Sequence, residues 1–355
     1  MAEQKQQHRV SGDKLRAFIA SSFEAVAVPR DDAKVIAELM TQADINGSDG
    51  HGVFRLPQYI RRIKGKAVNV NPKIRVEREM AGMALVHGDN GMGHLVMKYA
   101  TEKAIEKAKT AGVAWVGARW SNHAGPAALY ASMPLAHDMI GVYMAVGSAN
   151  HLPPWGGLDM LLSTNPLAVA VPAGEEPAIV LDMATTVAAY GKVKTKAQRG
   201  EMMPEGWMMD RQGNPLTDPK RANEGFLLPI GGYKGYGLAL VLGLLAGNLN
   251  GAAMGKDVID FNNDDTSETN TGHAIVAINI KAFQDLKEFK SGMDTLICDI
   301  RNSQRLPNVD RIRLPGEGTH TARADREKNG IPMPDALLAA LDALAGELKI
   351  AKLAR

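Results

Sequence analysis

Short apolar runs bounded by turn residues recur between residues 73 and 280, and they require a fold that contains a sheet. Such runs, alternating or continuous and ending near Gly, Pro or Asn, are typical of strands. The runs that predict strands are 73–77, 84–88, 112–117, 141–146, 168–172, 178–181 and 273–280. A helix with inward-facing apolar residues is predicted at 93–110, between the second and third runs. The chain is therefore predicted to have a mixed α/β or α+β fold.

The two ends of the chain are predicted to be mostly helical. Ser11 can cap a first helix, and Asp31 can begin a second, each with apolar residues at helical spacing. A last helix is predicted at 334–348, with its leucines on one side. We expect three parts: a helical N-terminal region at 1–68, a mixed-sheet region at 69–310, and a C-terminal loop and helix at 311–355 that packs back on the body.

Composition argues against several classes of protein. The 41 basic and 39 acidic residues leave a net charge of +2, without a basic patch for nucleic acid. The longest apolar helix candidate, 238–249, is too short to cross a bilayer, and no signal peptide is expected after the polar residues 1–8. The single thiol, Cys298, cannot form an internal disulfide, and its apolar neighbours predict a small core residue. We expect a cytoplasmic protein without nucleic-acid or membrane partners.

The segment 49–59 is the first candidate for chemistry. It places His51, Arg55 and Tyr59 at four-residue intervals, which on a helix would bring the three side chains to one side. An imidazole can move a proton, and a guanidinium can hold a carboxylate through two hydrogen bonds. The trio suits an enzyme that holds a small acid; a solvated surface helix is the alternative. Pro57 predicts that the helix either starts late or kinks.

Three further motifs each allow a functional and a structural reading. His123 follows a strand and can face a cleft or act as a cap. Asp182 ends an apolar strand, where it can orient a histidine, hold a ribose or cap a helix. The glycines of 231–237, with Lys234 at the start of a helix, can bind an anion such as a pyrophosphate or allow close packing.

Other motifs favour structural roles. Lys192, Lys194 and Lys196 alternate on one side of a segment that is predicted to be an edge strand. His87 and His94 have no carboxylate or thiolate at ligand spacing, so no metal site is expected. The turn at 88–93 lies between a strand and a helix, but its glycines are ordered GxxGxG rather than GxGxxG. A conventional Rossmann site is therefore not expected.

Several blocks in this order resemble the type-II malate/L-lactate dehydrogenase family. That family includes ureidoglycolate, sulfolactate and 2,3-diketo-gulonate oxidoreductases and piperideine-2-carboxylate reductases. The blocks are 51–57, 121–125, 153–156, 164–166, 181–186, 232–237 and 314–317, which together cover nearly the whole chain. The resemblance implies an oxidoreductase that uses NAD or NADP, a nicotinamide domain that is not a Rossmann fold, domains that are discontinuous in sequence, and a homodimer.

The resemblance also implies roles for single residues. His51 and His123 become the two candidates for acid/base catalysis, with Asp182 as a partner of the catalytic imidazole. Arg55 and Tyr59 would hold the substrate carboxylate. The residues implied in cofactor binding are Ser148, Asp182, Met183, Ala184, Thr185, Lys234, Gly316, Glu317 and Gly318. Two departures stand out: Gly50 where family members commonly have Ser, and a Gly-Glu-Gly-Thr-His run at 316–320 in place of a more usual version that contains Arg.

The predicted reaction is hydride transfer between a nicotinamide and a small 2-hydroxy or 2-oxo acid. The alternatives are reduction of a cyclic imine, such as piperideine- or pyrroline-2-carboxylate, and a catalytically silent homologue that binds ligands. Gly50 is the best support for the silent homologue. The sequence does not choose between NAD and NADP; Arg119 and the basic stretch 192–199 are candidate determinants.

Overall fold

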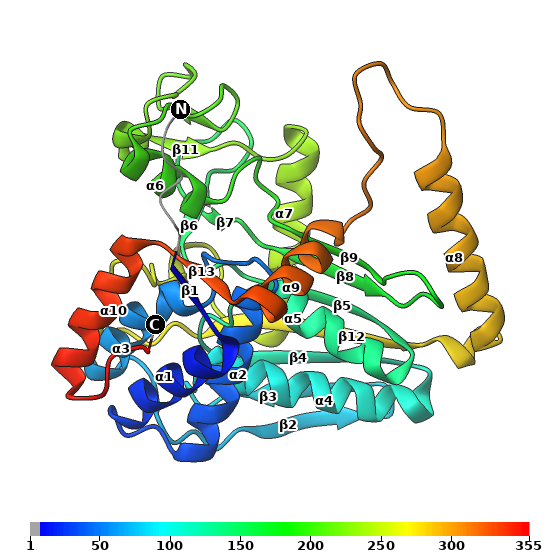
Figure 1. Cartoon of the computed structure of the whole chain (residues 1–355), viewed down its shortest axis with the longest axis horizontal. Helices are drawn as coiled ribbons and strands as arrows, with labels where there is room; N and C mark the ends of the chain where they lie inside the picture. Colours follow the sequence, from blue (N-terminus) through cyan, green and yellow to red (C-terminus); the bar gives the residue numbers. More distant parts are fainter. Residues whose placement is uncertain (1–7, 355) are drawn as a thin grey trace.

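A seven-stranded mixed sheet forms the centre of the molecule (Figure 1). The computed structural model describes residues 8–354, so residues 1–7, where we expected no signal peptide, lie outside the described range. In spatial order the strands are β2 (Arg75–Met80), β3 (Met83–His87), β4 (Val113–Ser121), β12 (Thr271–Asn279), β5 (Met139–Ala145), β8 (Leu167–Val171) and β9 (Ile179–Met183). Neighbours pair antiparallel except β3 and β4, which are parallel. The predicted mixed α/β fold is confirmed.

Helices cover both faces of this sheet. The parallel pair β3 and β4 needs a crossover, and α4 (Gly93–Ala111) supplies it and packs on β4 and β12. Successive side chains of β12 point to opposite faces of the sheet. Ile275 packs into the core on the α4 face, and Ala274 packs into a separate cluster under α7 (Tyr233–Ala246). The central strand β12 thus joins two cores.

The two ends of the described chain meet in a separate helical core. β1 (His8–Val10) pairs antiparallel with β13 (Ile331–Met333). Ser11 caps the first helix by accepting a hydrogen bond from the backbone N–H of Lys14 at 3.3 Å, as the sequence predicts. The helices that share this core are α1 (Gly12–Glu24), α2 (Arg30–Ile45), α3 (Leu56–Lys64) and α10 (Asp335–Leu348) (Figure 1). The domain boundaries at 68 and 310 stay predictions.

A smaller unit lies above one end of the sheet, at the top of Figure 1. It has its own apolar cluster and contains α6 (Tyr190–Arg199), β10 (Met208–Asp210), η3 (Pro219–Glu224) and β11 (Gly225–Leu227). The other elements are η1 (Val53–Arg55), α5 (Ala127–Ser132), η2 (Met133–His137), β6 (Asn150–Leu152), β7 (Leu162–Ser163), η4 (Asn248–Asn250), η5 (Gly255–Asp257), η6 (Ile280–Ala282), α8 (Leu286–Asn302) and α9 (Glu317–Asn329). Within residues 8–354, no helix is both long and apolar enough to span a bilayer.

Two predictions about local structure are wrong. The three lysines, Lys192, Lys194 and Lys196, lie on α6 rather than on an edge strand. Lysine is a good helix former, and Val193 between them packs into the small core, so the segment forms a helix. Cys298 is exposed on α8 instead of lying in the core. Its neighbour Ile297 is the fully buried residue, so the helix turns the thiol outward.

Candidate active site

His51 lies in a turn that precedes α3, so the helical spacing predicted for it is wrong. Its backbone N–H donates to the carbonyl oxygen of Ser48 at 2.8 Å, and a short 3-10 helix, η1, follows. α3 begins at Leu56, with Pro57 in its first turn. This is the late start that Pro57 allows, since a proline there removes no helical hydrogen bond.

A buried carboxyl group holds this turn. Asp44 of α2 is 3% exposed, and its Oδ2 accepts a hydrogen bond from the backbone N–H of Val53 at 2.8 Å. A Cβ at Gly52 would lie 2.1 Å from Oδ1 of Asp44, so only glycine fits there. Burial raises the pKa of Asp44 to about 8. The sequence reasoning missed Asp44, although it lies at helical spacing from the apolar Ile36 and Met40.

The turn brings His51 against His123, which enters from the end of β4. The two imidazole rings are nearly parallel, with centroids 5.7 Å apart. The Tyr59 hydroxyl and Nδ1 of His123 share a hydrogen bond of 2.6 Å, and Phe261 stacks on the His123 ring at 5.0 Å. Burial lowers the pKa of His51 to about 4 and the pKa of His123 well below its usual value. Both imidazoles are therefore neutral near pH 7.

Arg55 lies beside this group and has neutral oxygens as its partners. Its guanidinium donates to the Gly50 carbonyl at 3.0 Å, to Gln58 Oε1 at 3.0 Å and to Asn262 Oδ1 at 3.1 Å. Across residues 8–354, no carboxylate lies within ion-pair distance of Arg55. A half-buried guanidinium without a counter-charge is suited to bind a carboxylate from a ligand.

The departure at Gly50 is not required by packing. A Cβ at Gly50 would meet no atom within 4 Å, whereas its carbonyl supports Arg55. A serine would therefore fit, and the absence of its hydroxyl leaves the Arg55 contact intact.

A second buried imidazole lies behind Tyr59. His94 of α4 is fully buried, and its ring meets the Tyr59 ring edge-on at 5.5 Å. Neither of its nitrogens has a hydrogen-bond partner among the residues that the structure describes. Burial lowers the pKa of His94 to about 3. This neutral ring packs beneath Tyr59, in keeping with the structural role predicted for it.

A cavity of about 280 Å³ opens beside Arg55. The polar residues that line it are Asn150, His151, Tyr190, Lys194, Asn223, Asp260, Asn262 and Asn263. Oδ1 of Asn150 is buried and accepts no hydrogen bond from residues 8–354. No local pattern in the sequence singled out Asn150, His151 or Asn262.

Two of the predicted cofactor residues lie near each other, around the start of α7. The Thr185 hydroxyl donates to the Thr164 carbonyl at 2.8 Å, and the Thr185 carbonyl accepts from the N–H of Ile230 at 3.0 Å, just before α7. Lys234 is exposed in the first turn of α7, after two glycines with φ of 60° and 67°. The first N–H groups of a helix have no partner within it, so this end fits the phosphates of a dinucleotide.

The other cofactor candidates are spread more widely. The Ser148 carbonyl accepts from the N–H of Phe261 at 2.9 Å, beside the imidazoles. Asp182 Oδ2 accepts from the N–H of Ala128 at 2.9 Å in the first turn of α5, and within the described chain it bonds to no histidine. Asp182 thus caps a helix, while its role as a partner of the imidazole stays a prediction. Met183 and Ala184 connect Asp182 to Thr185 and are half-buried.

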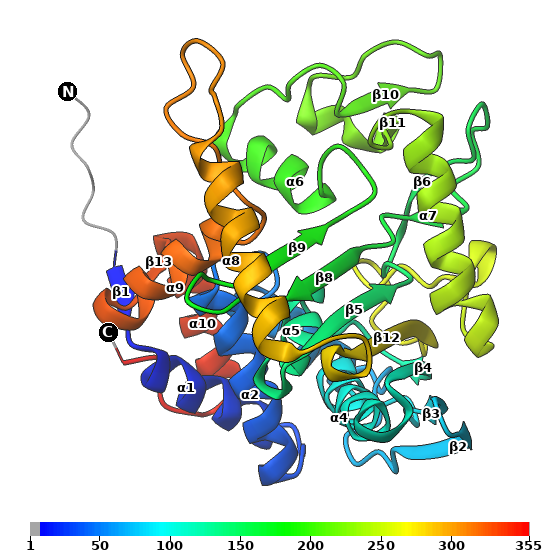
Figure 2. The same ribbon diagram turned by 90° about the vertical axis from the view of Figure 1, so that its right-hand side faces the viewer.

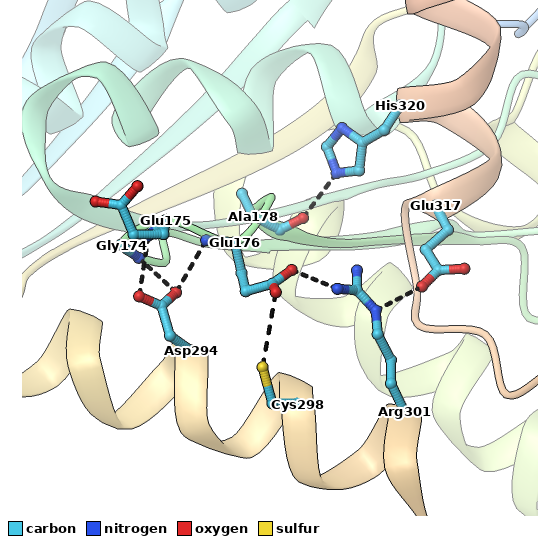
Figure 3. Close-up of polar contacts among 9 residues, drawn as sticks. All are labelled: Gly174, Glu175, Glu176, Ala178, Asp294, Cys298, Arg301, Glu317 and His320. Carbon is cyan, nitrogen blue, oxygen red and sulfur yellow. Dashed lines mark hydrogen bonds and ion pairs between the residues drawn. The ribbon is translucent and has the colours of Figure 1, made fainter.

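The loop Gly316–Gly318 begins α9 and packs against β9 (Figure 3). The φ of Gly316 is 98°, and a Cβ there would lie 3.0 Å from the backbone nitrogen of Val180. Glu317 accepts from Nε of Arg301 at 3.2 Å, and Arg301 also pairs with Glu176. His320 and the Ala178 carbonyl share a hydrogen bond of 2.8 Å (Figure 3). The Glu317 carboxylate is therefore engaged with α8.

Known proteins share both the sequence and the fold. The malate/L-lactate dehydrogenase family model matches residues 10–342. Malate dehydrogenase from Pyrococcus horikoshii is 39% identical over 345 residues, with 95% of this chain and 94% of that protein covered. The solved sulfolactate dehydrogenase from Methanocaldococcus jannaschii superposes with a TM-score of 0.89 at 34% identity and covers 97% of this chain and 98% of its own.

A less similar structure bears on the alternative reaction. The delta1-piperideine-2-carboxylate reductase from Pseudomonas syringae has a TM-score of 0.82 at 28% identity, covering 95% of this chain and 100% of its own. Taken together, the fold and the site define an oxidoreductase. The chain belongs to the malate/L-lactate dehydrogenase family, and the resemblance noted from the sequence is confirmed. It is an oxidoreductase of 2-hydroxy acids that uses NAD or NADP.

Proposed function

We propose that this enzyme transfers a hydride between C2 of a small 2-hydroxy acid and NAD or NADP, with His123 as the acid/base group and Arg55 as the carboxylate anchor. The observation that supports this assignment is the hydrogen bond between Tyr59 and His123 beside a guanidinium that lacks a counter-charge. His51 has no such side-chain hydrogen bond within the described residues and supports His123 by stacking.

The chain contributes binding and proton transfer. Arg55 holds the substrate carboxylate through two hydrogen bonds, which fixes the orientation of C2. The Tyr59 hydroxyl and Nδ1 of His123 share a hydrogen bond that orients the imidazole, so Nε2 is the nitrogen that exchanges a proton with the substrate hydroxyl. Because burial lowers the pKa of His123, the imidazole is neutral and ready to act as a base. The start of α7, with Lys234, would hold the dinucleotide phosphates, and the bound nicotinamide accepts the hydride.

Substitutions test these roles. His123→Gln should lower kcat by about 10²–10⁴-fold, because it removes the proton acceptor. His51→Gln should cost less, and both variants should keep the affinity for NADH, measured by fluorescence titration. Arg55→Met should lower kcat/KM by about 30–1000-fold, equivalent to roughly 2–4 kcal/mol.

Three outcomes would refute the assignment. A greater loss of kcat in His51→Gln than in His123→Gln would move the acid/base role to His51. Faster reduction of piperideine-2-carboxylate than of any 2-oxo acid would favour the cyclic imine reductase. Turnover of neither class, despite binding of NADH or NADPH, would favour the silent homologue.

We also propose that the enzyme is a cytoplasmic homodimer. The outer side of α7, at the right of Figure 2, exposes Val241 by 51% and Leu244 by 43%, and Leu249 just beyond is 62% exposed. Adjacent exposed apolar side chains favour a protein interface. Light scattering should give twice the chain mass, and Val241→Glu with Leu244→Glu should reduce it; a wild-type monomer at micromolar concentration would contradict the dimer. Recovery in a membrane or secreted fraction would contradict the location.

A further inference from the structure

Lys194 lines the cavity that opens beside Arg55, and within residues 8–354 its ammonium forms no ion pair. Its ammonium lies 5.5 Å from the centroid of the Tyr190 ring, and both residues line the cavity. The Tyr190 ring is in turn stacked on His151 at 4.2 Å, with an angle of 11° between the rings. A cation held over an aromatic ring in this way remains available for an anionic ligand.

The acidic residue of the cavity is engaged elsewhere. Asp260 Oδ1 accepts from the backbone N–H of Asn262 at 2.8 Å, and its Oδ2 accepts from the side chain of Asn263 at 2.7 Å. These hydrogen bonds close the turn that carries Asn262. Asp260 therefore serves this turn and does not pair with Lys194.

The same turn joins Lys194 to Arg55. Asn262 lines the cavity and accepts a hydrogen bond from the Arg55 guanidinium at 3.1 Å. Partial burial and the positive charge of Arg55 lower the pKa of Lys194, and the nearby Asp260 opposes them. Lys194 thus lines the cavity while Arg55 lies behind Asn262 in its wall, and an anionic ligand between the two cations would relieve their repulsion.

We propose that Lys194 is a specificity-determining residue that pairs with the second anionic group of the substrate. This inference rests on the proposed function, in which Arg55 holds the C1 carboxylate. The substrate class is then a 2-hydroxy acid with a distal carboxylate or sulfonate, rather than a monocarboxylic acid such as lactate. A nucleotide phosphate is the other anion that a lysine could bind, but the partner-free N–H groups at the start of α7 fit that role.

The test compares malate with lactate, and oxaloacetate with pyruvate, in the wild type, in Lys194→Met and in Lys194→Arg. Lys192→Met is the matched control, because Lys192 lies on the same helix outside the cavity lining. Lys194→Met should lower kcat/KM for malate by about 10–100-fold and change that for lactate by less than about threefold. Lys194→Arg should retain most of the malate activity, and Lys192→Met should match the wild type.

Each outcome separates the claims. If wild-type enzyme oxidises 2-hydroxy acids but Lys194→Met leaves the ratio of malate to lactate unchanged, this inference fails and the proposed function stands. A rise in KM for NADP with no change in that ratio would assign Lys194 to the nucleotide 2′-phosphate and overturn the inference. If the wild type oxidises neither acid with either nucleotide, the proposed function fails first.

Discussion

At the scale of single residues, the most consequential side chain outside the imidazole group is Arg62. It is fully buried in α3, yet it meets no carboxylate within ion-pair distance in the described part of the chain. Its guanidinium donates to the carbonyl of Ser267 at 2.7 Å and to that of Asp264, and it lies 5.5 Å from the centre of the Phe261 ring. A buried charge thus fixes the loop 261–267, which carries Phe261 onto His123.

Replacing this residue should weaken both the fold and catalysis. Arg62→Met leaves two partly buried carbonyls without this donor, so the free energy of unfolding should fall by about 2–4 kcal/mol in urea titrations. The loop should also exchange its amide hydrogens faster, and kcat should fall because Phe261 is no longer held against His123.

The neighbouring residue is the matched control for Arg62. Arg61 is 54% exposed and pairs with Asp265 across 3.3 Å in solvent. Such a pair contributes about 0–1 kcal/mol, so Arg61→Met should leave stability and kcat nearly unchanged. Equal losses in the two variants would show that the carbonyl contacts of Arg62 are not what holds the loop.

At the scale of helices and strands, periodicity predicted the elements that bury an apolar stripe. The strands of the central sheet and the helices α1, α2, α4, α7 and α10 all fall close to their predicted ranges. α8 was not predicted, although Phe289, Met293, Leu296, Ile297 and Ile300 recur along it at helical spacing. Of these residues only Ile297 is fully buried. The N-cap of α8 also carried a signal: the Asp285 carboxylate accepts from the N–H groups of Lys287 and Glu288.

The candidate site could be predicted only as far as local spacing reaches. Arg55 and Tyr59 are neighbours on the chain, and their convergence follows from α3. Phe261 and Asn262 come from a loop some two hundred positions away, which the central placement of β12 brings back over α3. No periodicity encodes such a contact, because it depends on the order of strands in the sheet. The position after a strand made His123 a candidate, and the family resemblance gave it an acid/base role. The structure alone supplied Asp44, Asn150 and Phe261.

At the scale of the whole molecule, neutral imidazoles in the interior link stability to pH. Burial lowers the pKa of His94 to about 3 and of His273 to about 4, against a usual 6.5. His273 is held by hydrogen bonds with the Tyr143 hydroxyl at 2.8 Å and the Asn122 carbonyl at 3.2 Å. Below pH 6.5 the unfolded chain binds protons that the folded chain does not, so stability falls as the pH falls.

His94 allows this linkage to be isolated, because within residues 8–354 it makes no hydrogen bond that a substitution would break. Its neutral state contributes fully above pH 6.5, and the contribution is lost as the pH falls toward 3. Urea unfolding of wild type and His94→Leu from pH 4 to 8 should therefore give a constant difference above about pH 7. Below pH 6.5 the free energy of unfolding of the wild type should fall by roughly 1.4 kcal/mol more per pH unit than that of the variant. The reason is that the variant lacks the proton that His94 takes up on unfolding, while the other histidines contribute equally to both proteins. Parallel curves across the whole range would mean that His94 takes up a proton as readily in the folded enzyme as in the unfolded chain, and that burial does not lower its pKa.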